Sequence, residues 1–576
     1  MKPLSQILED ARSSDQSQDI EMEGLPKQMD DKDMVRLGKK PVLKTGFLIG
    51  FGSGDRTRFL TSNVTAELWL YVDLGLQLYG AYNMGGFFGV GEQSHKIFLA
   101  LKKLLKFCSV FDSGFTNGGP AGIIYGYVLV WIGTLSTFAT LSELTSMAPT
   151  SGGQYHWVSM MAPPKYQKFL SYITGWLTVS GWQAFVASDG YLNGTMTQGL
   201  IILSLPGYVS QPWHAVMLYW GIILFCVFIN TIVSSWLPKF EGLILILHIL
   251  GFFAIIFPLV ILGPHGNSSD VFTTFHNGGN WPTNGLSFMV GLLGNVFAFF
   301  GADAAIHMSE EIQNASVVVP QSIMLSIVLN GAMGFGMALA LLFCIGDVSA
   351  TITPPTTFLF IDIFYQAVQS RVGAALMTAL VVTLALCATV GTMASASRQL
   401  WSFSRDRAVP GWKYLQRVDP RTAVPVASVA VTTMISCLLA LIALGSSTVF
   451  NDIVSLSVVG LFGSYQMAAV LLLLRRWKGE IQSYESHLNT LTNVPGAPLE
   501  WGPWRVPEPF GTINNVFTIT YLTIIFFFSL WPPGIAPTVA TMNYGVLMLG
   551  VALIFSITYY FAYARKVYTG PVIEIS

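Results

Sequence analysis

The stretch VGAALMTALVVTLALCATVGTMASAS, residues 372–397, decides the fold class, because it contains no Asp, Glu, Lys or Arg. A helix needs roughly 20 apolar residues to cross a hydrocarbon core of about 30 Å, so this stretch is long enough to span a membrane. Similar uncharged runs occupy residues 424–450, 453–474 and 542–564. Over the whole chain 52% of residues are hydrophobic and only 11% are charged, against about 25% charged in soluble domains. The sequence therefore predicts an all-α integral membrane protein.

Eleven transmembrane spans are expected after residue 120. Their approximate bounds are 121–145, 169–204, 213–235, 241–263, 285–306, 322–346, 372–397, 424–446, 453–474, 513–531 and 542–564. The second span is long enough to cross the membrane at a strong tilt.

The distribution of basic residues predicts the orientation, because Lys and Arg in short loops gather on the cytoplasmic side of a membrane. The loops that follow the spans at 372–397 and 453–474 are rich in Lys and Arg, whereas the alternate loops together carry a single basic residue. Arg565 and Lys566 therefore place the C-terminus in the cytoplasm, and the basic residues of the N-terminal tail place that end there too. Two cytoplasmic termini require an even number of crossings, so about twelve transmembrane helices are expected.

The chain divides into four predicted parts. Residues 1–44 are polar with few aromatic side chains, so they are expected to form a disordered cytoplasmic tail. Residues 45–110 must contain the twelfth crossing, yet they are charged and weakly hydrophobic, so they form an atypical region in place of the expected first span. Residues 111–564 form the transmembrane domain, and residues 565–576 a cytoplasmic C-terminal tail.

Composition also excludes several classes of function. The formal net charge of -1 argues against nucleic acid as a partner, since no basic surface can neutralise phosphates. The five cysteines lack the spacing of a metal site or a disulfide framework, and no paired nucleophile and base is visible. We therefore expect neither an enzyme nor a bound metal or cofactor, and the predicted partners are the lipid bilayer and a small molecule. Asn267, in the sequon Asn-Ser-Ser, lies in a loop expected outside the cell.

The densest set of polar residues begins in the span at 285–306, in the string FAFFGADAAIHMSEEIQNASVVVPQSI of residues 297–323. Ionisable groups inside a span are costly unless they face a cavity or a partner, so each is a functional candidate. Five polar residues stand at intervals i, i+4, i+7, i+8 and i+11: Asp303, His307, Glu310, Glu311 and Asn314. A continuous α-helix would place them on one face, which predicts a polar path rather than a surface facing lipid.

A glycine precedes this polar set, in the order Phe300, Gly301, Ala302, Asp303. Glycine permits the helix to unwind and expose backbone groups to a ligand, as in transporters with broken helices. These four residues are therefore candidate substrate-binding residues. His307, Glu310 and Glu311 are candidate coupling or gate residues, although the two glutamates could equally mark the cytoplasmic end of the span.

The span at 169–204 carries a second candidate set. Asp189 is its only acidic residue, and a carboxylate near the middle of the membrane could hold a substrate ammonium group. Trp182 could add a cation–π face, and Gln183 beside it is a further candidate ligand. The alternative for Asp189 is a place near the outer mouth, or a hydrogen bond to a neighbouring hydroxyl.

Four motifs carry a resemblance to a known family: SGGQYHW at 151–157, KFLSYITGWLTVSGWQA at 168–184, HMSEEIQNASVVVPQSI at 307–323 and WSFSRDRAVPGW at 401–412. They resemble the fungal amino acid/choline transporter group of the amino acid-polyamine-organocation permeases, which includes permeases for γ-aminobutyrate (GABA) and choline.

The resemblance implies a LeuT-like fold of twelve spans, in which the first ten form two inverted repeats of five helices and two more follow at the C-terminal end. It implies a substrate held where the first and sixth spans unwind, with the sixth-span break at residues 300–303. It also implies a secondary active transporter that imports amino acids or related amines by alternating access, with proton coupling, in the plasma membrane or the vacuolar membrane.

Other classes of function remain open at this point. Residues 45–110 do not match the family's first-span segment, so a transport-inactive variant is one alternative. A nutrient sensor on a transporter scaffold is another, although such sensors usually need a long signalling tail. A channel would need a ring of carbonyls or charges around one pore, and the sequence contains no filter-like repeat.

Overall fold

The computed structural model describes residues 114–234, 237–345, 358–442, 449–484, 492–539 and 541–571. The predicted tail at 1–44 and the atypical region at 45–110 lie outside the described residues. Within the described part the chain is helical apart from one small sheet, in which β1 (Ile481–Gln482) pairs in parallel with β2 (Leu499–Glu500). The predicted all-α fold is confirmed.

All eleven predicted spans correspond to helices in the structure. They are α6 (Gly119–Met147), α8 (Gln167–Ser204), α9 (Pro212–Thr231), α10 (Leu237–Leu262), α12 (Asn284–Ala298) continued by the 3₁₀ helix η2 (Ala302–Glu311), α13 (Ala315–Phe343), α15 (Arg371–Arg405), α17 (Val426–Ile442), α18 (Val449–Trp477), α19 (Phe510–Phe528), and α20 (Gly545–Tyr559) with its extension η4 (Tyr560–Ala564). The short helices are α7 (Gln154–Met161), α11 (Ser268–Thr273), α14 (Leu359–Val368), α16 (Trp412–Leu415) and α21 (Arg565–Val567).

Nine helices of the described part are long and apolar enough to cross a membrane. The other two predicted spans fall short for different reasons: α17 has 17 residues, and α8 is rich in polar and small residues. α8 packs against α7, α9, α15, α17 and α18. A helix surrounded by other helices has little contact with lipid, so it can carry polar side chains at little cost.

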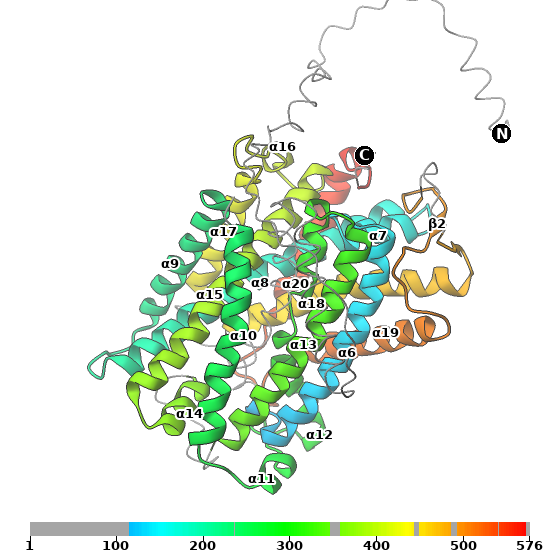
Figure 1. Cartoon of the computed structure of the whole chain (residues 1–576). Coiled ribbons are helices and arrows are strands. Elements are labelled where there is room, and N and C mark those ends of the chain that lie inside the picture. The colour runs from blue at the N-terminus through cyan, green and yellow to red at the C-terminus, as the bar shows by residue number, and fades with distance from the viewer. Residues whose placement is uncertain are drawn as a thin grey trace, which may run out of the picture. The chain divides into compact units, whose positions relative to one another are not determined.

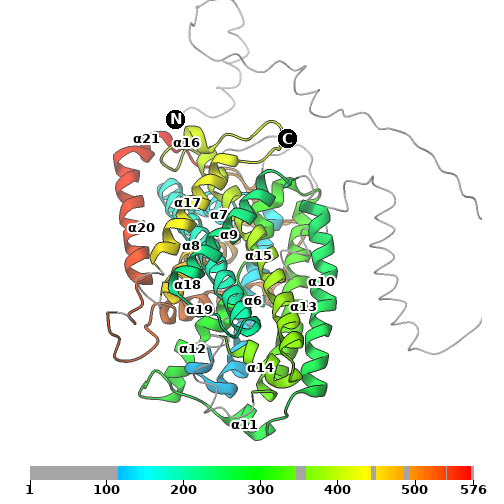
Figure 2. The same ribbon diagram turned by 90° about the vertical axis from the view of Figure 1, so that its left-hand side faces the viewer.

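The order of helices repeats along the chain. α6, α7, α8, α9 and α10 have 29, 8, 38, 20 and 26 residues. α13, α14, α15, α17 and α18 have 29, 10, 35, 17 and 29 residues. The two short helices, α7 and α14, lie at opposite ends of the bundle (Figures 1 and 2). This is the arrangement that two inverted repeats require. α12 and η2 precede the second half, and the corresponding segment before α6 lies outside the described residues.

Small residues bring the two halves into close contact. A Cβ atom on Gly460 of α18 would lie only 2.8 Å from the Cα atom of Gly181 on α8, so both positions need glycine for the backbones to approach. Close backbone approach through small residues is a common way for helices to pack in membranes, where the hydrophobic effect does not drive association. Through this contact α8, from the first half of the helix order, lies directly against α18, from the second half.

Candidate functional site

The sixth predicted span is interrupted where the sequence predicted a break. α12 ends at Ala298, and Phe299 and Phe300 continue as a turn. Gly301 then adopts a left-handed conformation with φ +89°, which glycine enters without the steric cost of a Cβ atom. Ala302 begins the 3₁₀ helix, so the backbone changes both direction and hydrogen-bonding pattern within the span.

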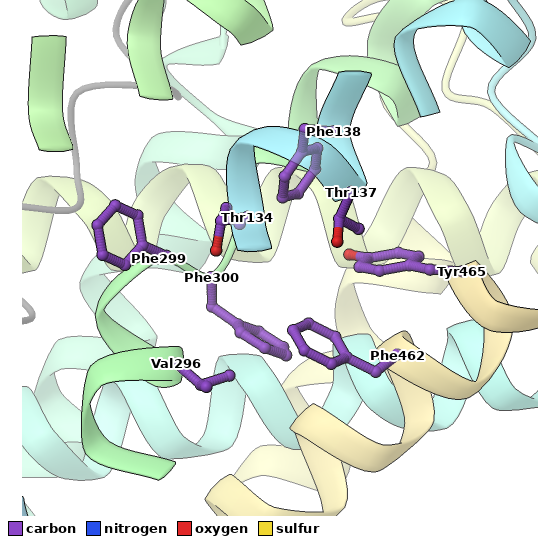
Figure 3. Close-up of a pocket in the computed structure, with 9 residues that line it drawn as sticks. Thr134, Thr137, Phe138, Val296, Phe299, Phe300, Phe462 and Tyr465 are labelled. Carbon is purple, nitrogen blue, oxygen red and sulfur yellow. The ribbon is translucent and has the colours of Figure 1, made fainter. Parts of the chain in front are cut away.

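A cavity of about 10 Å³ lies beside this break. Its lining residues come from α6, from the end of α12 and the break that follows it, and from α18: Thr134, Thr137, Phe138, Val296, Phe299, Phe300, Gly301, Phe462 and Tyr465. Figure 3 shows the rings and the two threonine hydroxyls gathered around this space. A cavity of this size holds about one water molecule, so the described residues are in a closed arrangement around the break.

Aromatic rings dominate the lining. The rings of Phe300 and Phe462 stack with centroids 5.3 Å apart, and Tyr465 lies 5.7 Å from Phe462. The ring of Phe185 on α8 packs edge-on against the Phe300 ring, with centroids 5.5 Å apart. No lysine or arginine is among the described residues that line this cavity. The faces of aromatic rings attract cations, so the lining favours an ammonium group over an anion.

Sequence reasoning predicted Phe300 and Gly301 as part of the site but missed the lining residues of α6 and α18. The predicted site rested on charged residues within the spans. α6 and α18 contribute uncharged ones, namely Thr134, Thr137, Phe138, Phe462 and Tyr465. The available signal was weak: Phe462 and Tyr465 stand three residues apart, which places them on one helical face.

Asp303 and His307 form a buried pair on the other side of the break. Both side chains are fully buried, and His307 Nε2 lies 3.8 Å from Asp303 Oδ2. The Tyr465 phenol of α18 also interacts with the Asp303 carboxylate. The His307 ring packs edge-on against Trp182, with centroids 5.5 Å apart. Asp303 is not among the residues that line the small cavity.

The polar residues after Gly301 do not form the single stripe that a continuous α-helix predicts. The segment is a 3₁₀ helix, in which residues advance by about 120° rather than 100°, so positions four apart no longer lie one above the other. Glu310 accepts hydrogen bonds from the Ser151 amide at 2.9 Å and from Arg405 at 3.2 Å. Glu311 pairs with Arg398. The expected common face is therefore wrong, and each acid has its own partner.

A second, larger cavity of about 560 Å³ lies at the end of the bundle that holds α7. Its polar lining includes Glu310 and Arg405, and Tyr155, which donates a hydrogen bond of 2.6 Å to Asp406. The lining continues into the loop before α19 through Asn493, which donates to the Met147 carbonyl. We call this space the vestibule, and it reaches η2 at Ser309 and Glu310.

The predicted substrate-binding residues of α8 lie on two different faces of that helix. Trp182 faces the break through His307. Gln183 points to α17, where its amide donates to the Thr432 hydroxyl at 3.1 Å. Asp189 is buried two turns further along α8, on the face that carries Trp182. Their roles in substrate binding stay predictions.

A helical bundle with membrane-spanning helices, an interrupted span, one cavity at that interruption and a larger one at the end of the bundle defines a membrane transporter. The chain belongs to the amino acid permease family, within the amino acid-polyamine-organocation superfamily, because the model of that family matches residues 96–554. Residues 1–95 lie outside the match.

Curated relatives agree with this assignment. The chain is 30% identical to an amino acid/polyamine transporter of Macrophomina phaseolina over 71% of this chain and 87% of the relative. It is 28% identical to the choline transporter of Saccharomyces cerevisiae, over 78% of this chain and 76% of the relative. It is also 27% identical to an amino-acid permease of Arabidopsis thaliana, over 83% and 92% of the two chains.

Proposed function

We propose that this protein is a secondary active transporter that imports a small amine or amino acid, of the GABA or choline type, by alternating access with proton coupling. One observation carries the substrate class: the cavity at the helix break is lined by five aromatic rings and by no lysine or arginine among the described residues. An ammonium group would bind against the faces of Phe300, Phe462 and Tyr465. The names of relatives, a choline transporter and a polyamine transporter among them, support the same chemistry.

The break also supplies a place for a substrate carboxylate. η2 begins at Ala302, so no helical turn precedes the backbone N–H groups of Ala302 and Asp303 to accept their hydrogen bonds. Such free amides at a helix N-terminus favour an anion. An amino acid could therefore place its ammonium group on the aromatic rings and its carboxylate on these amides, whereas choline would use the rings alone.

The vestibule supplies the path to one side of the membrane. Its end of the bundle carries Arg398, Arg405 and the basic residues around α16, so we place this end in the cytoplasm. The ion pairs Glu310–Arg405 and Glu311–Arg398 join η2 to α15 at the same end. These pairs would act as a gate that breaks and re-forms as the carrier alternates between its two open states. We place the carrier in the plasma membrane.

The experiment is uptake of labelled choline, GABA, a polyamine and several amino acids by permease-deficient cells that express the full chain. Expression at the membrane is measured in parallel. The proposal expects saturable uptake of at least one of these compounds, and expects Phe462→Leu, which removes one aromatic face, to raise KM for it. Surface expression without uptake of any compound would contradict the proposal and favour a transport-inactive variant or a sensor.

A further inference from the structure

The hydrogen bonds of His307 determine where its protons lie. His307 Nδ1 is 2.9 Å from the backbone carbonyl oxygen of Ser151. A carbonyl oxygen can only accept, so Nδ1 must carry a hydrogen. In the neutral ring the other nitrogen, Nε2, then has a lone pair and no hydrogen, and this atom faces Asp303.

The facing atoms of the pair need one proton between them. Asp303 Oδ2 and His307 Nε2 are 3.8 Å apart, and both side chains have no exposed surface. Without a proton, a carboxylate would face a lone pair in a buried site where a net charge is costly. With one proton the pair is either an imidazolium and a carboxylate or an imidazole and a carboxylic acid, and both forms are neutral overall. We propose that Asp303 and His307 together form a binding site for a single transported proton.

Other ionisable groups around η2 are engaged elsewhere. On the helices that pack against η2, Arg398 and Arg405 of α15 pair with Glu311 and Glu310. Glu143, the acidic residue of α6, pairs with Arg476 of α18.

The other helices near η2 are consistent with a proton site at Asp303 and His307. α13 carries no ionisable side chain within its bounds. From α18, the Tyr465 phenol interacts with the carboxylate, so it can donate to Asp303 when that group is ionised. On α8, Asp189 lies two turns from Trp182. On α7, His156 lies within the electrostatic field of Glu310 and Arg405.

The proton site connects directly to the vestibule. Ser151 accepts from His307 through its carbonyl and donates to Glu310 through its amide at 2.9 Å. Glu310 in turn accepts from Arg405. Gly153 packs tightly against the His307 ring, since a Cβ atom at this position would lie 3.3 Å from the ring. Loss of the proton would set the carboxylate against the Nε2 lone pair and displace the ring, which would disturb its hydrogen bond to Ser151 and the loop that borders the vestibule.

This inference rests on the proposed transport function and adds the location of the coupled proton. It assigns Asp303 to the proton rather than to the substrate ammonium, in agreement with its absence from the cavity lining. Tyr465 lines the cavity and also contacts the carboxylate, so it links the proton site to the bound substrate.

The test uses purified full-length protein in liposomes and two measurements with labelled choline, repeated with GABA. Counterflow, the exchange of labelled for unlabelled substrate, needs no proton gradient and reports the transport function alone. Accumulation driven by an inward proton gradient reports coupling, and one proton per cycle gives up to about a tenfold gain per pH unit. Asp303→Asn is the main variant, because its amide can donate to His307 Nε2 and mimic the protonated pair.

We expect Asp303→Asn to lose the gain in accumulation by a far larger factor than it loses counterflow. His307→Gln should lose the gain as well, which provides a second variant if the first does not fold. His248→Gln is the matched control, because His248 is also a buried histidine inside a span, on α10, and has no acidic partner in the same turn. Its gain should equal that of the wild type.

The outcomes separate the two proposals. If the wild-type protein shows no counterflow with either probe, the transport proposal fails. If counterflow is present but the wild type does not respond to the proton gradient, the proton site is wrong whatever the variants do. It is also wrong if Asp303→Asn or His307→Gln keeps the full gain.

Discussion

At the scale of single residues, a buried carboxylate close to the helix break distinguishes the candidate site of this membrane protein. In hydrocarbon a buried polar group without a partner is expensive. Asp303 is fully buried two residues after a glycine with a left-handed backbone, and the His307 ring and the Tyr465 phenol lie beside its carboxylate. The proposed substrate and proton sites both depend on this break and on the buried ionisable pair beside it.

Replacement of Gly301 by alanine tests the break itself. Alanine at φ +89° pays the cost of the left-handed conformation, about 1–2 kcal/mol, and its Cβ atom would lie 3.1 Å from the Phe185 ring. We expect Gly301→Ala to lower the maximal rate of uptake severalfold at equal surface expression. Gly221→Ala is the control, because that glycine is on α9 with open space around it, and its uptake should match wild type. Normal transport by Gly301→Ala would show that the break is not needed.

His156 predicts a dependence of stability on pH. This residue is on α7, outside the membrane-spanning helices, and burial lowers its pKa from 6.5 to about 4. Between those two values the unfolded chain binds more protons than the folded one, so stability falls as pH drops from about 6.5 to about 4. The loss reaches about 3 kcal/mol at the acidic end. Thermal unfolding in detergent should show a flatter pH profile for His156→Gln but an unchanged one for the exposed His265→Gln.

At the scale of elements, the loop before α19 is fastened to the end of α6. Arg476 of α18 donates to both oxygens of Glu143 at 2.8 Å, with the two side chains 4% and 0% exposed. The backbone amide of Val506 also donates to Glu143, and the Ser146 hydroxyl accepts from the Trp504 amide. Glu143 of α6 therefore contacts both the end of α18 and the loop before α19.

Glu143→Gln should destabilise the fold strongly. The substitution leaves buried Arg476 with only the more exposed Glu508 as an ionic partner, 3.3 Å away. We therefore expect a loss that approaches the cost of breaking a buried pair, about 3–5 kcal/mol. The double variant Glu143→Leu with Arg476→Met removes both charges and should recover part of that loss. Glu480→Gln is the control, since its pair with Arg475 is partly exposed and should matter little. Unfolding in detergent measures all three, and equal stability of Glu143→Gln and wild type would contradict the role of the pair.

At the scale of the whole molecule, the two sets of five helices place similar elements at opposite ends. α7 borders the vestibule at one end, while α11 and α14 lie at the other (Figures 1 and 2). The basic residues lie at the vestibule end, which is therefore expected to face the cytoplasm, and the end with α11 is expected to face outside.

The exposed Asn267, which precedes α11, tests this orientation. If the end with α11 faces outside, the sequon Asn267-Ser268-Ser269 enters the secretory lumen and can receive a glycan. We expect removal of N-linked glycans by an endoglycosidase to increase the gel mobility of the wild-type protein. Ser269→Ala keeps Asn267 but destroys the sequon, so this variant should migrate like the deglycosylated wild type before any treatment. Labelling of an engineered cysteine near α11 only after the membrane is opened would contradict the orientation.

The sequence by itself determined the class of fold and the positions of the eleven spans after residue 120. Apolar length and the absence of charge are local properties, and the bilayer thickness converts them into helices of known extent. The break at Gly301 was also predictable, because a glycine followed by polar residues inside an apolar span favours an unwound backbone. What local pattern could not predict was the 3₁₀ geometry of residues 302–311, which separates Asp303 from the face of the later acids.

Only the tertiary structure decided which side chains meet. The partners of the break come from α6 and α18, more than a hundred residues away on either side, and they carry no charge that a sequence search would notice. The pairing of His307 with Ser151 and of Glu310 with Arg405 likewise joins distant segments. Such contacts follow from how whole helices pack, because crossing position and rotation are set by small residues such as Gly181 and Gly460. The composition of each helix on its own does not contain that information.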